Sequence, residues 1–129
     1  MLPASSHVGG TISDATEPVQ VLVWVLSYDE AHPPAPHAIT AASAALLLSS
    51  APFTRAVAGV QVGRIDGKFI VNPTVEELQL SDIDLTMAGT EAAVMMIEGF
   101  ADFVSESDML DAVAAGHTAI AVICRQQQV

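Results

Sequence analysis

The sequence is short of basic residues. Only 4 Lys and Arg residues stand against 15 Asp and Glu, so the formal net charge at pH 7 is −11. A chain this acidic repels phosphate backbones and anionic membrane surfaces, so its net charge cannot provide the attraction for nucleic-acid binding. Any contact with RNA would depend on the four basic side chains, Arg55, Arg64, Lys68 and Arg125.

Cysteine, aromatic residues and long apolar runs are also scarce. Cys124 is the single cysteine, which excludes an internal disulfide. No apolar run approaches the roughly 20 residues that span a bilayer, so we expect no membrane partner. The first 18 residues contain no Lys or Arg, and so resemble neither a secretory signal nor an Arg-rich transit peptide. No targeting segment is visible.

What is present indicates one domain with an aliphatic core. The 129 residues are 51% hydrophobic but only 5% aromatic, so Val, Ile, Leu, Met and Ala must fill the interior. Residues 1–18, rich in Ser, Gly, Thr and Pro, predict a flexible leader. Residues 19–125 are therefore expected to form the folded domain.

The first half of this domain predicts one strand and one helix. Residues 19–26 are apolar and largely β-branched, which is typical of a strand covered on both faces. A proline-rich loop over 30–37 follows, and Pro36 suits the first turn of a helix over 36–50. Because residues 38–48 carry no charged side chain, we expect that helix to lie between a sheet and another layer.

The second half predicts two hairpins and two helices. Asp66–Gly67 is a strong hairpin turn between strands at 56–65 and 68–71. Thr74 and Glu77 form a capping box for a short helix over 74–80. Strands at 83–88 and 93–98 follow, and Ser105 caps a last helix that runs to Arg125.

These elements predict an α+β fold, with helices packed on a mostly antiparallel sheet of five main strands. The strand at 19–26 does not fit this arrangement well, since little of the sequence before it could form the neighbouring strands that it needs. We therefore expect its side chains to be unusually exposed and its free edges to pair with other chains. On this pattern the chain looks incomplete.

Carboxylates in the middle region are the only candidates for chemistry. A short helix and a strand start could bring Glu76 and Asp82 together as oxygen ligands of a divalent metal. The alternative is a solvated face on which Glu76 and Glu77 serve the helix dipole. We predict no catalytic and no cofactor-binding residue, because the prolines around His37 remove the N–H groups that a phosphate would need.

Several stretches resemble a known family in order and spacing. They are VQVLVWVLSYD at 19–29, GVQVGRI at 59–65, FIVNPT at 69–74, DLTMAGTEAAVMMIE at 84–98 and DML at 108–110. Together they are similar to the first RNase PH-like core of polynucleotide phosphorylase (polyribonucleotide nucleotidyltransferase). Trp24 in the first stretch is similar to chloroplast members. The resemblance covers residues 19–123 and implies a partial RNase PH-like fold, the end of its N-terminal part plus the C-terminal subdomain.

The resemblance also implies an activity for the full-length family. Its members are trimeric rings with two RNase PH-like cores per subunit. They degrade and process RNA by 3′–5′ phosphorolysis with Mg²⁺ and inorganic phosphate. The family's active site belongs to its second core: serines there correspond to Pro36 and His37 here, and two metal-side carboxylates correspond to Glu76 and Asp82. The implied compartment is the chloroplast, otherwise the mitochondrion or cytoplasm.

Three hypotheses follow for this chain. It is a fragment of such an enzyme and inactive alone, or it is a non-catalytic subunit that docks into a larger RNA-processing assembly. The third hypothesis is that it retains weak phosphorolytic or RNA-binding activity through Glu76 and Asp82. We predict that it releases no nucleoside diphosphate from poly(A), and that RNA is a partner of the full-length enzyme only. The sequence leaves open whether the chain is a natural product or a truncated gene model, and whether it folds alone.

Overall fold

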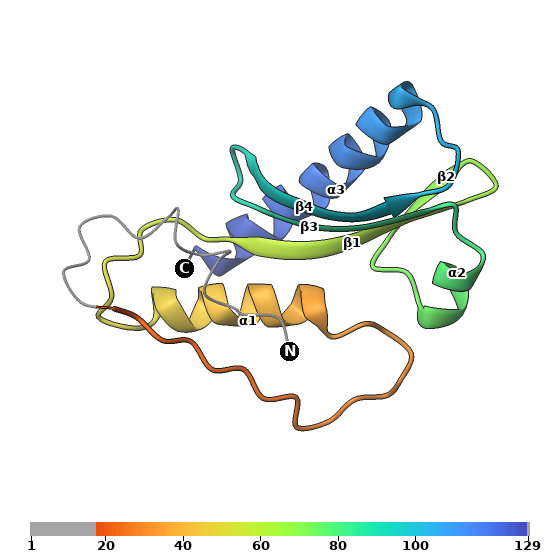
Figure 1. Ribbon diagram of the computed structural model, residues 1–129. Coiled ribbons are helices and arrows are strands. Elements are labelled where there is room, and N and C mark those ends of the chain that lie inside the picture. The colour runs from red at the N-terminus through yellow and green to blue at the C-terminus, as the bar shows by residue number, and fades with distance from the viewer. Residues whose placement is uncertain (1–17, 129) are drawn as a thin grey trace.

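The computed structural model describes residues 18–128, and in them a four-stranded antiparallel sheet lies between two helices (Figure 1). The elements are α1 (Ala35–Leu47), β1 (Ala58–Ile65), β2 (Lys68–Val71), α2 (Val75–Gln79), β3 (Ile83–Gly89), β4 (Val94–Ala101) and α3 (Glu106–Gln127). The strand order is β2-β1-β3-β4, with every pair antiparallel. The expected α+β fold is confirmed. Residues 1–17 of the expected leader lie outside the described residues.

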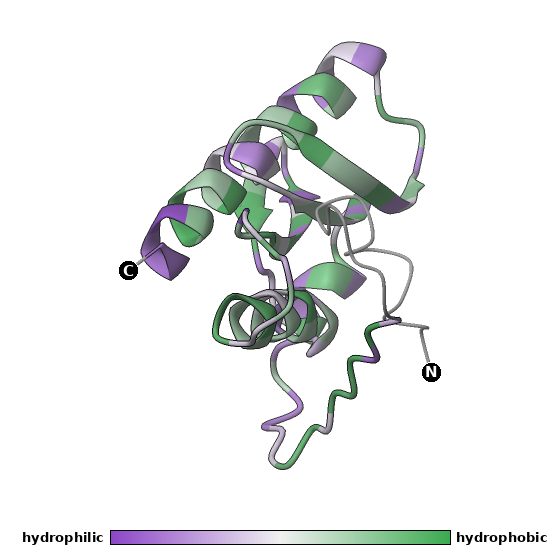
Figure 2. Cartoon of the chain, turned by 90° about the vertical axis from the view of Figure 1, so that its left-hand side faces the viewer, coloured by the Kyte–Doolittle hydropathy of each residue, from purple (hydrophilic) through white to green (hydrophobic). Residues whose placement is uncertain are grey.

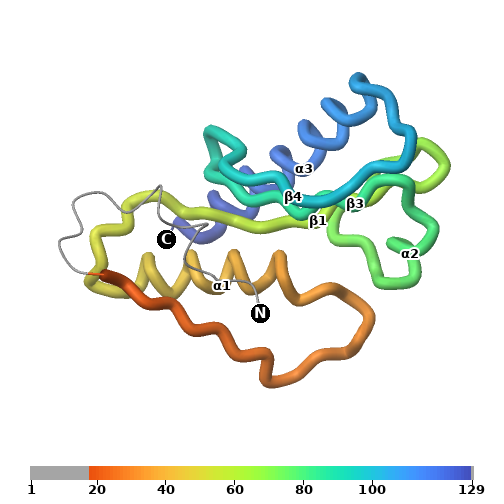
Figure 3. Tube along the Cα trace, viewed as in Figure 1, coloured from red at the N-terminus to blue at the C-terminus, as the bar shows by residue number. Residues whose placement is uncertain are grey.

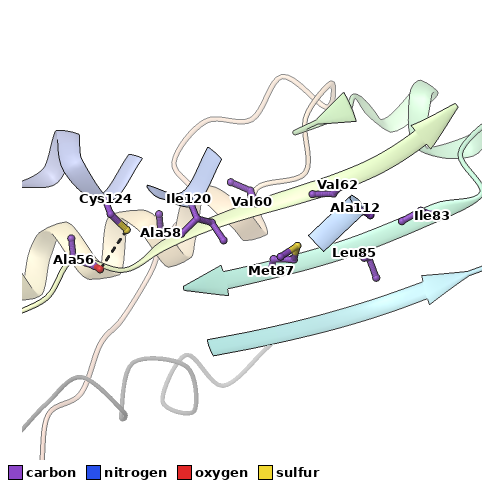
Figure 4. Packing of buried hydrophobic residues seen from close by; sticks show 10 residues of the cluster. All are labelled: Ala56, Ala58, Val60, Val62, Ile83, Leu85, Met87, Ala112, Ile120 and Cys124. Carbon is purple, nitrogen blue, oxygen red and sulfur yellow. Dashed lines mark hydrogen bonds between the residues drawn. The ribbon is translucent and has the colours of Figure 1, made fainter. Parts of the chain in front are cut away.

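The packing of α3 on one face of the sheet builds the main core (Figure 4). Its buried side chains come from β1, β3 and α3 and include Val60, Met87 and Ile120. Gly116 lets the helix approach closely, because a Cβ there would lie 2.5 Å from the sulfur of Met87. The thiol of Cys124 donates to the Ala56 carbonyl at 3.4 Å. Because this side chain is buried in the core, the pKa of the thiol is raised.

Small side chains let α1 approach the opposite face. The Ser43 hydroxyl accepts from the Val57 N–H at 2.8 Å, and the Thr40 hydroxyl accepts from the Gly59 N–H at 3.1 Å. The helix ends at Leu47, three residues before the predicted end. The reason is local: the Ser49 hydroxyl donates to the Leu46 carbonyl at 2.8 Å, so a side chain replaces the next helical donor.

The turn and caps follow the sequence signals. Asp66 and Gly67 both have positive φ, 50° and 74°, as a two-residue hairpin of this type requires. Thr74 and Glu77 form the predicted capping box, and the Ser105 hydroxyl accepts from the Asp108 N–H. These positions were set by local chemistry and are confirmed.

The strand predicted at 19–26 is not a strand, so the sheet has four strands rather than five. These residues are extended and run alongside α1, on the side away from the strands (Figures 1 and 3). No hydrogen bond within residues 18–128 uses their main chain. A strand is defined by its hydrogen-bonded ladder, and the described residues give this segment no partner to form one. Its predicted exposure is confirmed: Trp24 is 73% and Leu26 94% exposed.

One helix among the described residues, α3, is long and apolar enough to cross a membrane by length and composition alone. Its apolar side chains have another use here. Ala112, Gly116, Ile120 and Cys124 recur every four residues and are buried against the sheet. This arrangement is typical of a core helix.

Candidate functional site

A cluster of charged side chains lies at the C-terminal end of β1. Arg64, only 17% exposed, places Nη2 3.3 Å from Asp82 Oδ2 and Nη1 2.9 Å from Asp108 Oδ2. The Asp108 contact is an ion pair rather than a well-aligned hydrogen bond, because Nη1 has no acceptor in good hydrogen-bond geometry. The group therefore ties β1 to the residue before β3 and to the first turn of α3.

Backbone and hydroxyl groups hold this cluster in place. The Asp82 N–H donates to the Arg64 carbonyl at 3.1 Å, and the Ser81 hydroxyl accepts from the Arg64 N–H at 2.6 Å. The Ser105 hydroxyl donates to Asp108 Oδ2 at 2.7 Å. That hydroxyl first, and Arg64 second, lower the pKa of Asp108. Asp108 is thus stabilised as an anion, and Asp82 lies against the same guanidinium group.

The two predicted metal ligands have different neighbours. Asp82 faces Arg64, whereas Glu76 is exposed on α2 and lines a small cavity of about 320 Å³ with Asp29 and Glu30. No cluster of three or more His, Cys, Asp or Glu side chains within residues 18–128 is arranged to hold a metal. The setting of Asp82 fits a structural ion pair better than a divalent ion, and the metal pair remains a prediction.

A groove of about 880 Å³ lies between the extended segment and α1. Residues 23–29 form one wall, and His32, Pro34, His37 and Asn72 are among the others. No side chain caps the start of α1, where Pro34 and Pro36 remove two possible N–H donors. The groove therefore offers apolar surface with few groups that could hold an anion.

The basic residues do not gather into a patch within the described part of the chain. Arg64 is committed to its two carboxylates, and Arg125 lies 3.4 Å from Glu91 in an exposed pair. Arg55 and Lys68 are exposed, but they lie beyond opposite ends of β1. Binding of an RNA backbone requires several neighbouring cations, and the four basic side chains do not provide such a group.

Sequence reasoning missed the role of Arg64. It named this residue only as one of four possible RNA contacts, whereas the fold uses it internally. The available signal was the pair of acids near helix and strand starts, Asp82 and Asp108. Asp82 and Asp108 are far apart in the sequence, so the sequence does not show that both lie near Arg64 at the C-terminal end of β1. Only the register of the sheet and the packing of α3 bring them together there.

Comparison with known families identifies one match. Residues 55–119, about half of the chain, match the family model described as "3' exoribonuclease family, domain 2", the C-terminal domain of RNase PH type. The matched stretch covers β1 to β4 and most of α3.

Curated relatives extend the match toward the N-terminus. The chain is 50% identical over 106 residues to the probable chloroplastic polyribonucleotide nucleotidyltransferase 1 of rice, covering 82% of this chain and 12% of that protein. It is 53% identical over 106 residues to the polyribonucleotide nucleotidyltransferase of Chlamydia trachomatis serovar D, covering 82% of this chain and 15% of that protein. The chain therefore spans a small part of these relatives' length.

A solved structure supports the fold. The crystal structure of rice Rrp46 superposes with a TM-score of 0.64 at 19% identity, covering 73% of this chain and 46% of that one. At this identity the likeness concerns the fold alone. Taken with the family match, it confirms the RNase PH-like architecture. The chain belongs to the 3′ exoribonuclease family, and its residues 55–119 match domain 2 of that family.

Proposed function

We propose that this chain serves as a structural module of a phosphorolytic 3′–5′ exoribonuclease and carries no catalytic step of its own. The observation that carries the proposal is the Arg64 cluster. The one metal-ligand candidate near a cation, Asp82, is paired with Arg64, and Arg64 is itself bound by Asp108. Groups that neutralise each other are not available for a phosphate or a metal.

Phosphorolysis demands more than this chain supplies. Phosphate, metal and the RNA 3′ end must be held together, because positioning and charge neutralisation provide most of the rate. Here the prolines at the start of α1 withhold N–H groups, and the exposed basic residues are scattered. The chain also bears a formal charge of −11, which disfavours the encounter with RNA.

The remaining properties belong to the assembled enzyme. The polyribonucleotide nucleotidyltransferase relatives support a role in RNA degradation and processing. For the complete site we propose Mg²⁺ as the cofactor and inorganic phosphate as the attacking co-substrate. We propose a trimeric ring as the assembly and RNA as its substrate. The named chloroplastic relative supports a plastid location.

A direct assay tests the absence of catalysis. The purified chain is incubated with poly(A), inorganic phosphate and Mg²⁺, with the whole Chlamydia trachomatis enzyme as positive control. We expect no ADP from the chain, and no difference between it and the Asp82→Ala and Glu76→Ala variants. Phosphate-dependent ADP release that disappears in Asp82→Ala would overturn the proposal and favour weak catalysis through the two carboxylates.

A graft tests the structural role separately. The aligned 106 residues of the Chlamydia trachomatis enzyme are replaced by those of this chain, at 53% identity. We expect a folded chimaera that retains phosphorolysis, because the replaced stretch supports a site built elsewhere. A chimaera that assembles normally but loses all activity would show that the replaced stretch supplies catalytic groups that this chain lacks.

A further inference from the structure

The sheet has two edges of very different character. The β2 edge is only four residues long and begins at Lys68. The β4 edge is eight residues long, has Glu98 as its one charged residue, and exposes Ile97 (48%) and Phe100 (61%). Short strands and edge lysines discourage pairing with other chains. The β4 edge lacks both protections.

Exposed apolar side chains lie on both faces of β4. Ile97 pairs with Met87, which points into the core under α3, so Ile97 lies on the α3 face. Phe100 pairs with Asp84, which alternates with the core residues Ile83 and Leu85 and so lies on the opposite face. A strand added at this edge would therefore meet apolar side chains on both of its faces.

Residues 19–26, which we term the free segment, are such a strand. They too number eight, carry no charge, and present apolar side chains in both alternating rows, with Gln20 the single polar exception. Figure 2 shows this extended, mainly hydrophobic stretch standing off from the rest of the fold. No hydrogen bond within residues 18–128 uses its main chain.

We propose that the free segment of one copy of this chain adds to the β4 edge of a second copy as a fifth strand. The two stretches match in length and in having apolar side chains on both faces. Electrostatic repulsion also favours this pairing. Two copies, each with a formal net charge of −11, repel each other over most of their surface, but the free segment and the β4 edge together carry only one charged residue. Strand addition at an open edge satisfies the main chain of both partners.

The geometry favours a second copy over the chain's own edge. Within one chain the free segment runs along α1 on the side away from the strands (Figure 1), so pairing with its own β4 would require it to leave α1. Each copy then offers one segment and one edge. The contact is head-to-tail, and the assembly grows with concentration unless a ring closes.

Two variants break the two halves of this contact. Val23→Pro removes a main-chain donor from the free segment, and Ile97→Lys places a charge on the β4 edge. Val71→Lys on the β2 edge is the matched control. Circular dichroism verifies that each variant keeps its fold. Mass in solution is measured by light scattering over a concentration series, and Trp24, the only tryptophan, reports burial of the segment by its emission wavelength.

The expected results separate head-to-tail pairing from other associations. The natural chain and Val71→Lys should grow in mass with concentration and shift Trp24 emission to the blue, whereas Val23→Pro and Ile97→Lys should each stay monomeric. Mixing these two should restore a complex of two chains, because one supplies an intact segment and the other an intact edge. A monomeric natural chain, an Ile97→Lys variant that still associates, or an inert mixture would each overturn the proposal.

Discussion

The free segment and β1 are alike in sequence and opposite in structure. Each is eight residues long and has valine at alternate positions, 19, 21, 23 and 25 in the free segment and 60 and 62 in β1. In β1 the first six residues are buried between α1 and α3, and both edges are hydrogen-bonded, to β2 and β3. The free segment is largely exposed and has no ladder within residues 18–128. An apolar, β-branched run thus predicts extended backbone, but partners decide whether it becomes part of a core.

The same contrast explains how the chain is stabilised. The region from β1 to α3 has its own core, with Ile120, Met87 and Val60 fully buried. The free segment contributes only Val21 to a smaller cluster around Leu46 and Phe53. We therefore expect the free energy of unfolding to depend on the sheet and α3 and hardly on the free segment.

Truncating one apolar side chain in each region should give the largest difference. Ile120→Ala should lower the free energy of unfolding by about 3 kcal/mol, because it leaves a cavity beneath α3. Leu26→Ala should change it by less than about 0.5 kcal/mol, because that side chain is 94% exposed. Urea denaturation at low protein concentration measures both. A large loss in Leu26→Ala would mean that the segment is packed.

The ion-pair cluster should matter less than the core but more than a surface pair. Arg64→Met should cost about 1–2 kcal/mol, because it leaves two partly buried carboxylates without their cation. Arg125→Met is the control and should cost less than about 0.5 kcal/mol, because its pair with Glu91 is exposed and screened. Equal losses in urea denaturation would refute a special role for Arg64.

Loss of the α2 cap should have a smaller effect. Thr74→Ala removes the hydroxyl that accepts from the Glu77 N–H and should cost about 1 kcal/mol. Thr118→Ala removes a hydroxyl that donates only to the Ala114 carbonyl on the exposed side of α3, and should change the free energy of unfolding by less than about 0.5 kcal/mol. The same urea titration compares them. A stability loss in Thr118→Ala as large as that in Thr74→Ala would contradict this role for the cap.

Acid should weaken the fold in a defined window. The pKa of Glu77 lies below its ordinary value of 4.5, first because its carboxylate accepts from the Thr74 N–H, and that of Asp108 lies below 3.8, first because of the Ser105 hydroxyl. Lowered folded-state pKa values give stability that is present above the ordinary values and lost as pH falls through the folded ones. Urea midpoints between pH 7 and pH 3 should therefore fall mainly below about pH 4.5, and less steeply in Asp108→Asn.

Local signals in the sequence predicted most of the fold. The Asp66–Gly67 turn, the capping box at Thr74 and the cap at Ser105 depend on a few adjacent residues, and all are confirmed. The α1 end was misplaced by three residues, because the Ser49 hydroxyl competes with the helix in a way that composition does not show.

Long-range partners were less predictable. The pattern at residues 19–26 indicated a strand, but pairing depends on neighbours that the described residues do not provide. For the candidate site, the sequence drew attention to Asp82 and could not show that Arg64 reaches it from β1. Both outcomes depend on where distant segments meet in space.

Native-state hydrogen exchange tests most directly whether the free segment lacks an internal partner. The experiment is done at concentrations where the chain is monomeric, and exchange is followed residue by residue. Amides of residues 19–28 should exchange at nearly unprotected rates, whereas those of Val60 and Val62 in β1 should exchange only through global unfolding. Protection of residues 19–28 comparable to that of β1 would contradict a free segment and, with it, a surface available to another chain.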